Sequence, residues 1–265
     1  MLVKAGSAVP TVYFPSIEEL LAVGSPVTPI ASEDRTVHVW GFSLEGNTAA
    51  ASQCHSWLTK EERARGDRFI RREDRVRYVF AHGGLRAVLA QYTGDGPETL
   101  RLDVGSTGKP ALIQKGVPRQ SIQFNLSHSH GRMLLAIAQK REVGVDLEQI
   151  RDKLEVVKLA GRFYAPAEYE HVLNCSGSER RKQFYRYWVA KEAVLKGQGV
   201  GLPSLHECEI LTTSDSTGSS VRVGAHVALQ PGWSVRWLHC GDNWAAAVAS
   251  CGNDWNIRVM SLSRL

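Results

Sequence analysis

Three strand-like segments between residues 121 and 150 constrain the fold more than any other part of this sequence. In the first, "SIQFNLSH", apolar Ile122, Phe124 and Leu126 alternate with polar residues, which is the two-residue period of a strand with one buried face. The turn "SHG" leads to a second strand, "MLLAIAQ", and "EVGVDLEQI" makes a third. Strands joined by short turns pair antiparallel, so the middle of the chain is predicted to form antiparallel strands.

Helical segments lie on both sides of these strands. Thr59 and Glu62 have the spacing of a capping box at a helix N-terminus. The helix is predicted to continue through "REDRVRYVFAHGGLRAVLAQY" and to end at Gly94 and Pro97. The other expected elements are a short helix near "SIEELLAV", a strand over 36–44, helices around 153–173 and 179–197, and strands near 205–212, 220–229, 233–239 and 244–250.

This order of elements occurs loosely twice along the chain. Long helices beside antiparallel strands in two successive halves predict an α+β protein with two similar subdomains. We expect an N-terminal extension over residues 1–36 packed on the fold, an N-terminal subdomain over 37–140 and a C-terminal subdomain over 141–265.

The composition is that of an ordinary globular protein, with 43% apolar and 22% charged residues. The apolar run "MLLAIA" is far too short to cross a bilayer, and residues 1–10 have no apolar stretch of the secretory type. The five cysteines are scattered and form no C-x-x-C pair, which argues against a disulfide framework and a zinc knuckle. We therefore expect a cytoplasmic protein.

Positive charge is concentrated at residues 60–77, "KEERARGDRFIRREDRVR", which hold eight Lys or Arg against five Asp or Glu within a net charge of +5. One interpretation is a solvated helix face held by pairs four residues apart. The other is a surface that binds phosphate or an acidic partner.

Two groups of charged residues could carry chemistry. In "GVDLE", strand periodicity sends Asp146 and Glu148 to one face, where they must be solvated or share a cation such as Mg²⁺. In "WVAKEAVLK", Glu192 and Lys196 form an acid–base pair one helical turn apart beside Trp188. If this pair is partly desolvated, it needs further partners, for which a metal and an anion are suitable.

Two other motifs have simpler interpretations. "GQGVGL" follows a helix, whereas a phosphate cradle would precede one, so it is interpreted as a tight exit turn. "NLSHSH" places histidines at alternate positions, but a zinc site would need a third suitable ligand nearby. A histidine at the end of a strand is better suited to donate a hydrogen bond to an anion or a carbonyl.

Taken together, five motifs resemble the Sfp-type 4′-phosphopantetheinyl transferase family. In the family's order they are "REDRVR" (72–77), "TGKP" (107–110), "NLSHS" (125–129), "GVDLE" (144–148) and "WVAKEAVLK" (188–196). The resemblance implies a pseudo-two-fold α+β fold with coenzyme A in the cleft between the halves. It also implies transfer of the phosphopantetheine arm of coenzyme A to a serine of an apo carrier protein, with release of adenosine 3′,5′-bisphosphate.

The resemblance further implies roles for individual residues. Asp146, Glu148 and Glu192 would hold Mg²⁺, or Mn²⁺ in its place, against the pyrophosphate. Glu192 would take the proton of the incoming serine, and Lys196 would offset charge or deliver a proton on the leaving phosphate. Arg77 and His128 are expected to contact the 3′-phosphate of coenzyme A, and Arg65, Lys109 and Ser127 are expected to line the nucleotide. Lys191 is expected to bind a phosphate, with an outward structural role as the alternative. Glu168 would be a supporting acid.

Three residues depart from the family pattern. Glu62 stands where relatives often carry a basic nucleotide-binding residue, which puts the contacts at the adenine end in question. Val189 replaces the usual Ser, Thr or Cys after the tryptophan, and His130 adds a ring after the "NLSHS" motif.

Two other functions are compatible with parts of the sequence. A Mg²⁺-dependent hydrolase of nucleotides or phosphoesters would use the same carboxylates with water as the nucleophile. A nucleic-acid-binding module would use the basic segment, but Phe69 is its only aromatic residue, so stacking on bases is poorly supported. The number and order of the motifs favour the transferase.

The expected partners of the transferase are coenzyme A and acidic apo carrier proteins of acyl, peptidyl or polyketide type. No membrane or nucleic acid is expected as a partner, and the protein is expected to be a monomer.

Overall fold

A computed structural model describes most of the chain. The described residues are 9–22, 35–105, 108–113, 122–212, 218–223 and 230–260. Parts of three expected features lie outside them, namely the N-terminal extension over 1–8 and 23–34, Thr107 of "TGKP", and residues 224–229 of the expected strand 220–229.

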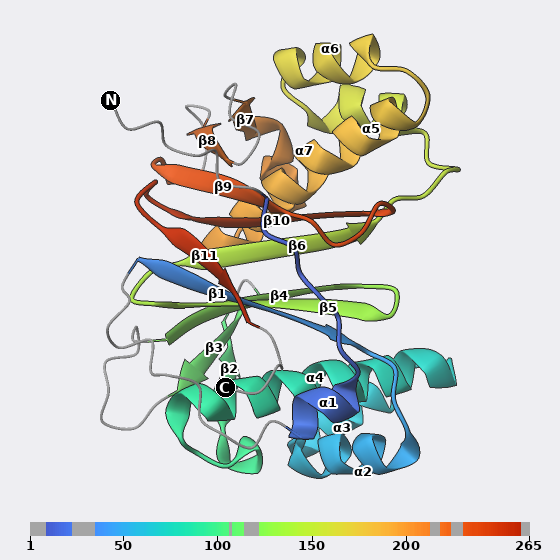
Figure 1. The fold of residues 1–265 in the computed structure, drawn as a ribbon, viewed down its shortest axis with the longest axis vertical. Coiled ribbons are helices and arrows are strands. Elements are labelled where there is room, and N and C mark those ends of the chain that lie inside the picture. Colours follow the sequence, from blue (N-terminus) through green and yellow to red (C-terminus); the bar gives the residue numbers. More distant parts are fainter. Residues whose placement is uncertain are drawn as a thin grey trace.

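The helices and strands, which are labelled in Figure 1, form two lobes. The first lobe contains α1 (Ile17–Ala22), β1 (Thr36–Ser43), α2 (Thr48–Trp57), α3 (Lys60–Gly66), α4 (Arg72–Thr93), the 3-10 helix η2 (Pro97–Thr99), β2 (Arg101–Val104), β3 (Pro110–Ile113), β4 (Ile122–Ser129) and β5 (Arg132–Gln139). The second contains β6 (Val143–Gln149), α5 (Val156–Phe163), α6 (Pro166–Asn174), α7 (Gly177–Gln198), the 3-10 helix η3 (Leu202–Glu207), β7 (Cys208–Thr212), β8 (Gly218–Val223), β9 (Trp233–Leu238) and β10 (Trp244–Cys251).

Each lobe is built on one sheet. The strand order is β11-β1-β5-β4 in the first and β6-β10-β9-β8-β7 in the second, while β2 and β3 form a two-stranded sheet of their own. The last strand, β11 (Asn256–Val259), returns to the first lobe and pairs parallel with β1. The predicted α+β class with two subdomains is confirmed, and the division at residue 140 stays a proposal.

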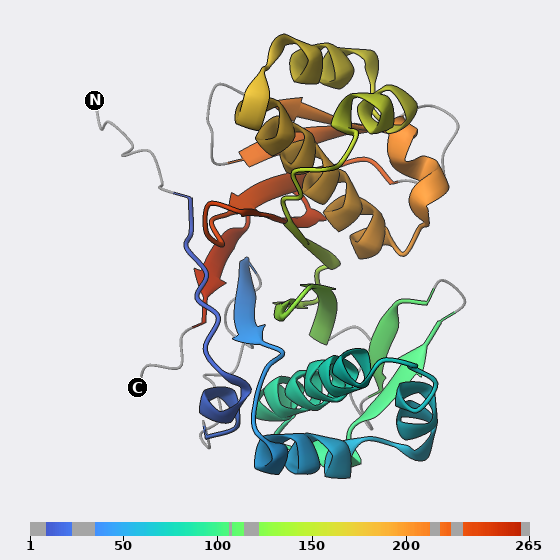
Figure 2. The same cartoon turned by 90° about the vertical axis from the view of Figure 1, so that its right-hand side faces the viewer.

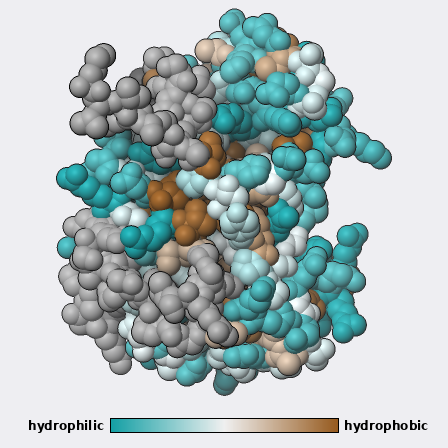
Figure 3. Space-filling model, in the orientation of Figure 1, coloured by the Kyte–Doolittle hydropathy of each residue, from teal (hydrophilic) through white to brown (hydrophobic). Residues whose placement is uncertain are grey.

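Helices cover the outer faces of the two sheets. Figures 1 and 2 show α1, α2 and α4 on one side of the molecule and α5, α6 and α7 on the other, with the sheets between them. On β5, Met133, Leu135 and Ile137 pack toward the first group of helices, whereas Leu134 and Ala136 pack in the core between the sheets. This alternation follows from the two-residue period of a strand that is buried on both faces. The face drawn in Figure 3 shows hydrophobic residues gathered between the two lobes.

The described part of the N-terminal segment crosses both lobes, as the dark blue trace in Figure 2 shows. His239 N donates to Pro10 O and Val12 N donates to His239 O, both at 2.9 Å, so this part follows the second lobe. Farther along, Ser43 N donates to Pro15 O at 2.8 Å, which ties the segment to the first lobe before α1 begins.

Within the described ranges, no helix has the length and apolar character that a membrane span requires.

Two long helices expected from the sequence are each interrupted. The capping box of Thr59 and Glu62 is confirmed, but α3 ends at Gly66 and α4 begins only at Arg72. The chain reverses there because α3 packs back on α4, and a Cβ on Gly66 would lie 3.1 Å from the ring of Tyr78. The single helix expected around 153–173 is likewise two, α5 and α6, since Pro166 disfavours helical geometry in the residue before it. Helix α2 and the pair β2–β3 were not predicted.

Strand β6 approaches α7 very closely. Val145 points into the core between the sheets, while Gly144 and Asp146, on the opposite face of the strand, meet α7. A Cβ on Gly144 would overlap the carbonyl oxygen of Ala193 and lie 2.5 Å from Gly197 N. Only glycine permits this approach, which brings the last turns of α7 against the acidic face of β6.

We expect Gly144→Ala to lower the free energy of unfolding by roughly 1–3 kcal/mol, because an extra methyl group in a packed site forces backbone and side chains apart. Gly105→Ala is the matched control, since nothing lies within 4 Å of a Cβ at that position. Urea unfolding of the two variants measures the difference. Equal stability would show that the β6–α7 contact tolerates a side chain.

Candidate active site

Three polar side chains of β4 bridge the two lobes. Asn125 Oδ1, Ser127 Oγ and Ser129 Oγ accept hydrogen bonds from alternate backbone N–H groups of β6, at 3.0, 3.3 and 3.3 Å. These side chains point to one face of β4 because they are two residues apart. They satisfy β6 N–H groups on the side away from β10, where none of the described strands pairs with β6. We call this set the β4–β6 ladder.

The serines of the ladder also orient the two carboxylates of β6. Ser127 Oγ donates to Asp146 Oδ1 at 2.8 Å, and Ser129 Oγ donates to Glu148 Oε2 at 3.0 Å. Asp146 is only 2% exposed. A buried carboxylate needs such donors, since desolvation of a charge is costly without partners.

Lys196 reaches this group from the last turn of α7. Its Nζ lies 2.5 Å from Asp146 Oδ1 and 3.0 Å from Ser127 Oγ. Burial by itself would lower the pKa of Lys196, but the attraction of Asp146, followed by that of Glu192 and Glu148, raises it. The lysine therefore stays charged beside the carboxylates.

The carboxylates carry more negative charge than Lys196 can balance. Desolvation, followed by the charge of Asp146, raises the pKa of Glu192 to about 7. The same two causes raise the pKa of Glu148. The second oxygen of Asp146, Oδ2, is buried and has no hydrogen-bond partner among the described residues. The charges of Asp146 and Glu148 on β6 thus act on Glu192 of α7.

The same carboxylates do not form an assembled metal cluster. Across the described part of the chain, no group of three His, Cys, Asp or Glu side chains has the arrangement of a metal site. Lys196 already occupies Oδ1 of Asp146, so one carboxylate oxygen is engaged by an internal cation.

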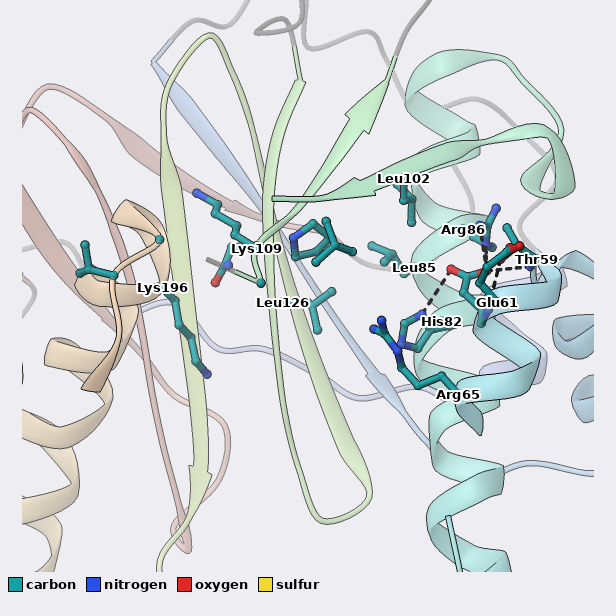
Figure 4. Close-up of a pocket in the computed structure, with 17 residues that line it drawn as sticks. Thr59, Glu61, Arg65, His82, Leu85, Arg86, Leu102, Lys109, Leu126 and Lys196 are labelled. Carbon is teal, nitrogen blue, oxygen red and sulfur yellow. Dashed lines mark hydrogen bonds and ion pairs between the residues drawn. The ribbon is translucent and has the colours of Figure 1, made fainter. Parts of the chain in front are cut away.

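A cavity of about 540 Å³ opens beside Lys196. Figure 4 shows Lys109 and Lys196 on one side of it and Arg65 and His82 on the other. Lys109 Nζ donates to Gly197 O at 2.5 Å, so it also neutralises the C-terminal end of α7. The structure therefore brings together Arg65, Lys109 and Lys196, three of the predicted cations. Asp146, Glu148 and Glu192 are not among the residues that line this cavity.

A second cavity, of about 230 Å³, adjoins the first through His82 and Leu85, which line both. It contains Arg77 and His128, the two residues predicted at the 3′-phosphate. Arg77 lies 3.8 Å from Asp74. Desolvation, with Lys196 and His82 adding positive charge nearby, lowers the pKa of His128.

Glu62 has a structural role that explains its departure from a basic residue. Its Oε2 lies 2.9 Å from Arg86, which is buried, and its Oε1 lies 3.5 Å from His82. Desolvation alone would raise its pKa, but the nearby His82 ring, the hydrogen bond from the Thr59 N–H and the charge of Arg86 outweigh this and lower the pKa to about 2. Glu62 therefore holds α3 against α4 as an anion.

Lys191 lies buried and away from both cavities, contrary to its expected place at a phosphate. Its side chain is fully buried, and Nζ lies 2.7 Å from Glu168 and donates to Leu205 O and Cys208 O at 3.0 and 2.5 Å. All three N–H donors are thus used inside the second lobe. Glu168 in turn accepts from Ala165 N and caps the start of α6. Both residues are structural, and neither lines the two cavities.

Sequence reasoning missed several residues of this region. Asn125 and Ser129 stand inside "NLSHS", and their alternation with Ser127 was a usable signal that they share one face. His82 and its stacking partner Tyr78, with ring centroids 4.1 Å apart, have no local signal, because their position depends on how α3 folds back on α4.

We expect Lys191→Met to lower the free energy of unfolding by roughly 3–5 kcal/mol, because it leaves the buried Glu168 carboxylate unpaired. Chemical denaturation measures this loss, and the double variant Lys191→Met/Glu168→Gln should recover part of it. A variant that stays as stable as the wild type but binds coenzyme A more weakly would restore the phosphate-binding role.

Two family models match adjacent parts of the chain. Residues 142–249 match the model of the 4′-phosphopantetheinyl transferase superfamily, and residues 46–141 match that of the 4′-phosphopantetheinyl transferase N-terminal region. The chain is 36% identical over 213 residues to 4′-phosphopantetheinyl transferase HetI of Nostoc sp., covering 80% of this chain and 86% of HetI. It is 29% identical over 148 residues to Sfp of Bacillus subtilis, covering 56% of this chain and 62% of Sfp. The chain therefore belongs to the 4′-phosphopantetheinyl transferase family.

Proposed function

We propose that this protein transfers the 4′-phosphopantetheine arm of coenzyme A to a serine of an apo carrier protein, releasing adenosine 3′,5′-bisphosphate. The observation that carries the proposal is the meeting of Asp146, Glu148 and Lys196 through the β4–β6 ladder. This group adjoins a cavity lined by further cations. Coenzyme A is a polyanion, and clustered cations at a cleft favour such a ligand.

The two cavities suit the two phosphate-bearing parts of coenzyme A. Arg65, Lys109 and Lys196 line the larger one, whose volume of about 540 Å³ is in the range of small-molecule sites. We place the pyrophosphate near these cations and the 3′-phosphate near Arg77 and His128 in the smaller cavity. A bound phosphate would favour the charged form of His128.

The residues present fit a divalent cation such as Mg²⁺, or Mn²⁺. Asp146 Oδ2 is a buried oxygen without a partner among the described residues, and desolvation, followed by repulsion from Asp146, raises the pKa values of Glu148 and Glu192. Hard cations prefer such oxygen ligands. When bound there, the cation would neutralise charge on the pyrophosphate, and Asp146, Glu148 and Glu192 would hold it.

The chain's own residues account for the proton and the charge. Glu192, with a pKa of about 7, is suited to take the proton of the serine hydroxyl at neutral pH. The serine oxygen then forms a bond to the β-phosphorus of coenzyme A, and the bond from that phosphorus to the bridging oxygen breaks. Lys196 offsets the charge that collects on the departing bisphosphate, and the ladder serines keep Asp146 and Glu148 in place.

The setting of this reaction is also proposed. The net charge of +5 favours an acidic carrier protein. All five cysteines are free, which is consistent with a reducing cytoplasm. We propose that the protein works there as a monomer.

Mass spectrometry of a panel of apo carrier proteins, incubated with coenzyme A and Mg²⁺, tests the function. We expect the wild type to add the phosphopantetheine mass to at least one carrier. Asp146→Asn should lower kcat/KM by at least about 100-fold, since it removes a preorganised charge from the reacting site. Asp95→Asn, an exposed residue after α4, is the matched control. Release of adenosine bisphosphate from coenzyme A without a carrier would instead favour a hydrolase.

Glu192→Gln tests the acidic cluster through stability. The raised pKa means that the folded state binds this proton more tightly, so the contribution of Glu192 to stability falls as pH rises from about 4.5 to about 7. We expect Glu192→Gln to melt at a higher temperature than the wild type at pH 8 and close to it at pH 4.5.

Added Mg²⁺ should raise the melting temperature of the wild type at pH 8 more than that of Glu192→Gln. Glu170→Gln, which changes an exposed acid of α6, should follow the wild type in both measurements. An identical response to Mg²⁺ in all three proteins would remove Glu192 from the cation site.

A further inference from the structure

A single isoleucine projects from the loop between α3 and α4. Ile70 is 100% exposed and its neighbour Phe69 is 39% exposed. Single exposed apolar residues are common on proteins, but this one lies in the most basic segment of the chain. We call residues 68–72 the Ile70 surface.

Arginines flank this isoleucine in the sequence. Arg68, Arg71 and Arg72 are exposed, and none of them forms an ion pair with any residue that the structure describes. The arginines farther along α4 differ, because Arg75 and Arg77 each lie within 4.0 Å of an aspartate. The arginines that form ion pairs therefore lie in the second part of the basic segment, and their partners are three and eight residues away, not four.

The loop is held in place by its own hydrogen bonds. Asp67 N donates to Arg63 O at 2.9 Å, and Phe69 N donates to Gly66 O at 3.2 Å. Arg75 Nη2 donates to Phe69 O at 3.3 Å. Since the backbone around Ile70 is already ordered, a partner that covers it loses little conformational entropy on binding.

The Ile70 surface adjoins the candidate site. Phe69 lines the cavity of about 230 Å³ that also contains Arg77, Tyr78 and His128. Its ring packs on Tyr78, with centroids 5.5 Å apart. A macromolecule that rests on Ile70 therefore lies beside the cavity that Phe69 and His128 both line.

We propose that the Ile70 surface docks the carrier protein, through a partner patch in which carboxylates surround an apolar side chain that covers Ile70. Free arginines call for negative charge, and a fully exposed aliphatic side chain calls for an apolar partner. Nucleic acid would supply the charge but would use an aromatic face for stacking, and the ring of Phe69 is already packed on Tyr78. This inference rests on the proposed function, since it identifies where the second substrate binds.

Steady-state kinetics with an apo carrier protein test the proposal. Ile70→Ala and Arg71→Glu should each lower kcat/KM for the carrier by roughly tenfold, as expected for residues at the centre of an interface. The KM for coenzyme A should not change. In Arg71→Glu the dependence of kcat/KM on salt should also be weaker, because a long-range attraction has been removed.

Matched controls are available on the second lobe. Leu173, 37% exposed on α6, gives Leu173→Ala as the control for Ile70→Ala. Lys182, exposed on α7, gives Lys182→Glu, which changes the net charge as Arg71→Glu does. Neither control should change kcat/KM for the carrier. If both controls lowered kcat/KM as much as the loop variants do, the loss would not be specific to the Ile70 surface, and the proposal would be overturned.

A binding measurement separates this proposal from the proposed function. Fluorescence anisotropy of labelled apo carrier reports docking without turnover. Ile70-dependent binding without transfer would retain the docking surface and overturn the function. If the wild type transferred the arm and Ile70→Ala and Arg71→Glu bound and modified the carrier equally well, the docking surface alone would be overturned. Weaker binding of duplex DNA by Arg71→Glu would not change that conclusion. If the wild type neither bound nor modified any carrier, both would fall.

Discussion

The β4–β6 ladder is the interaction on which the site depends. Among the described strands, backbone pairing ends at β4 in one sheet and at β6 in the other, and Asn125, Ser127 and Ser129 supply the hydrogen bonds that a further strand would have made. Because the hydroxyls of the two serines also donate to Asp146 and Glu148, two of the three residues that join the lobes also orient the acids. A shift between the lobes would therefore disturb the proposed chemistry at once.

Two lysines of α7, each paired with a buried carboxylate of another element, show how structure separates support from chemistry. Lys191 and Glu168 satisfy each other and nearby backbone groups completely. Lys196 and Asp146 do not, since Asp146 keeps a buried oxygen without a partner among the described residues, and Glu148 and Glu192 add further charge. A satisfied pair fixes a fold, whereas an incompletely balanced group beside a cavity can still gain free energy by binding an ion or a substrate.

The long helices show where sequence reasoning stopped. The capping box at Thr59 was visible because its signal is local, but the end of α3 at Gly66 depends on contact with Tyr78 in another helix. The same loop exposes Ile70, so the interruption that was not predicted created the surface proposed to dock the carrier. Lys191 was misassigned for a related reason: it stands next to Glu192 in the motif, yet about 100° around the helix from it.

The sequence by itself determined the class of fold, the alternation that puts Asp146 and Glu148 on one face of β6, and the family, because these depend on spacing along one element or on motifs in order. Only the tertiary structure decided which charges meet. Lys191 meets Glu168 and Lys196 meets Asp146 because α6 and β6 pack on different faces of α7, and Gly144 allows β6 to approach the helix closely. That distance is set by packing between elements far apart in the chain, which no local pattern encodes.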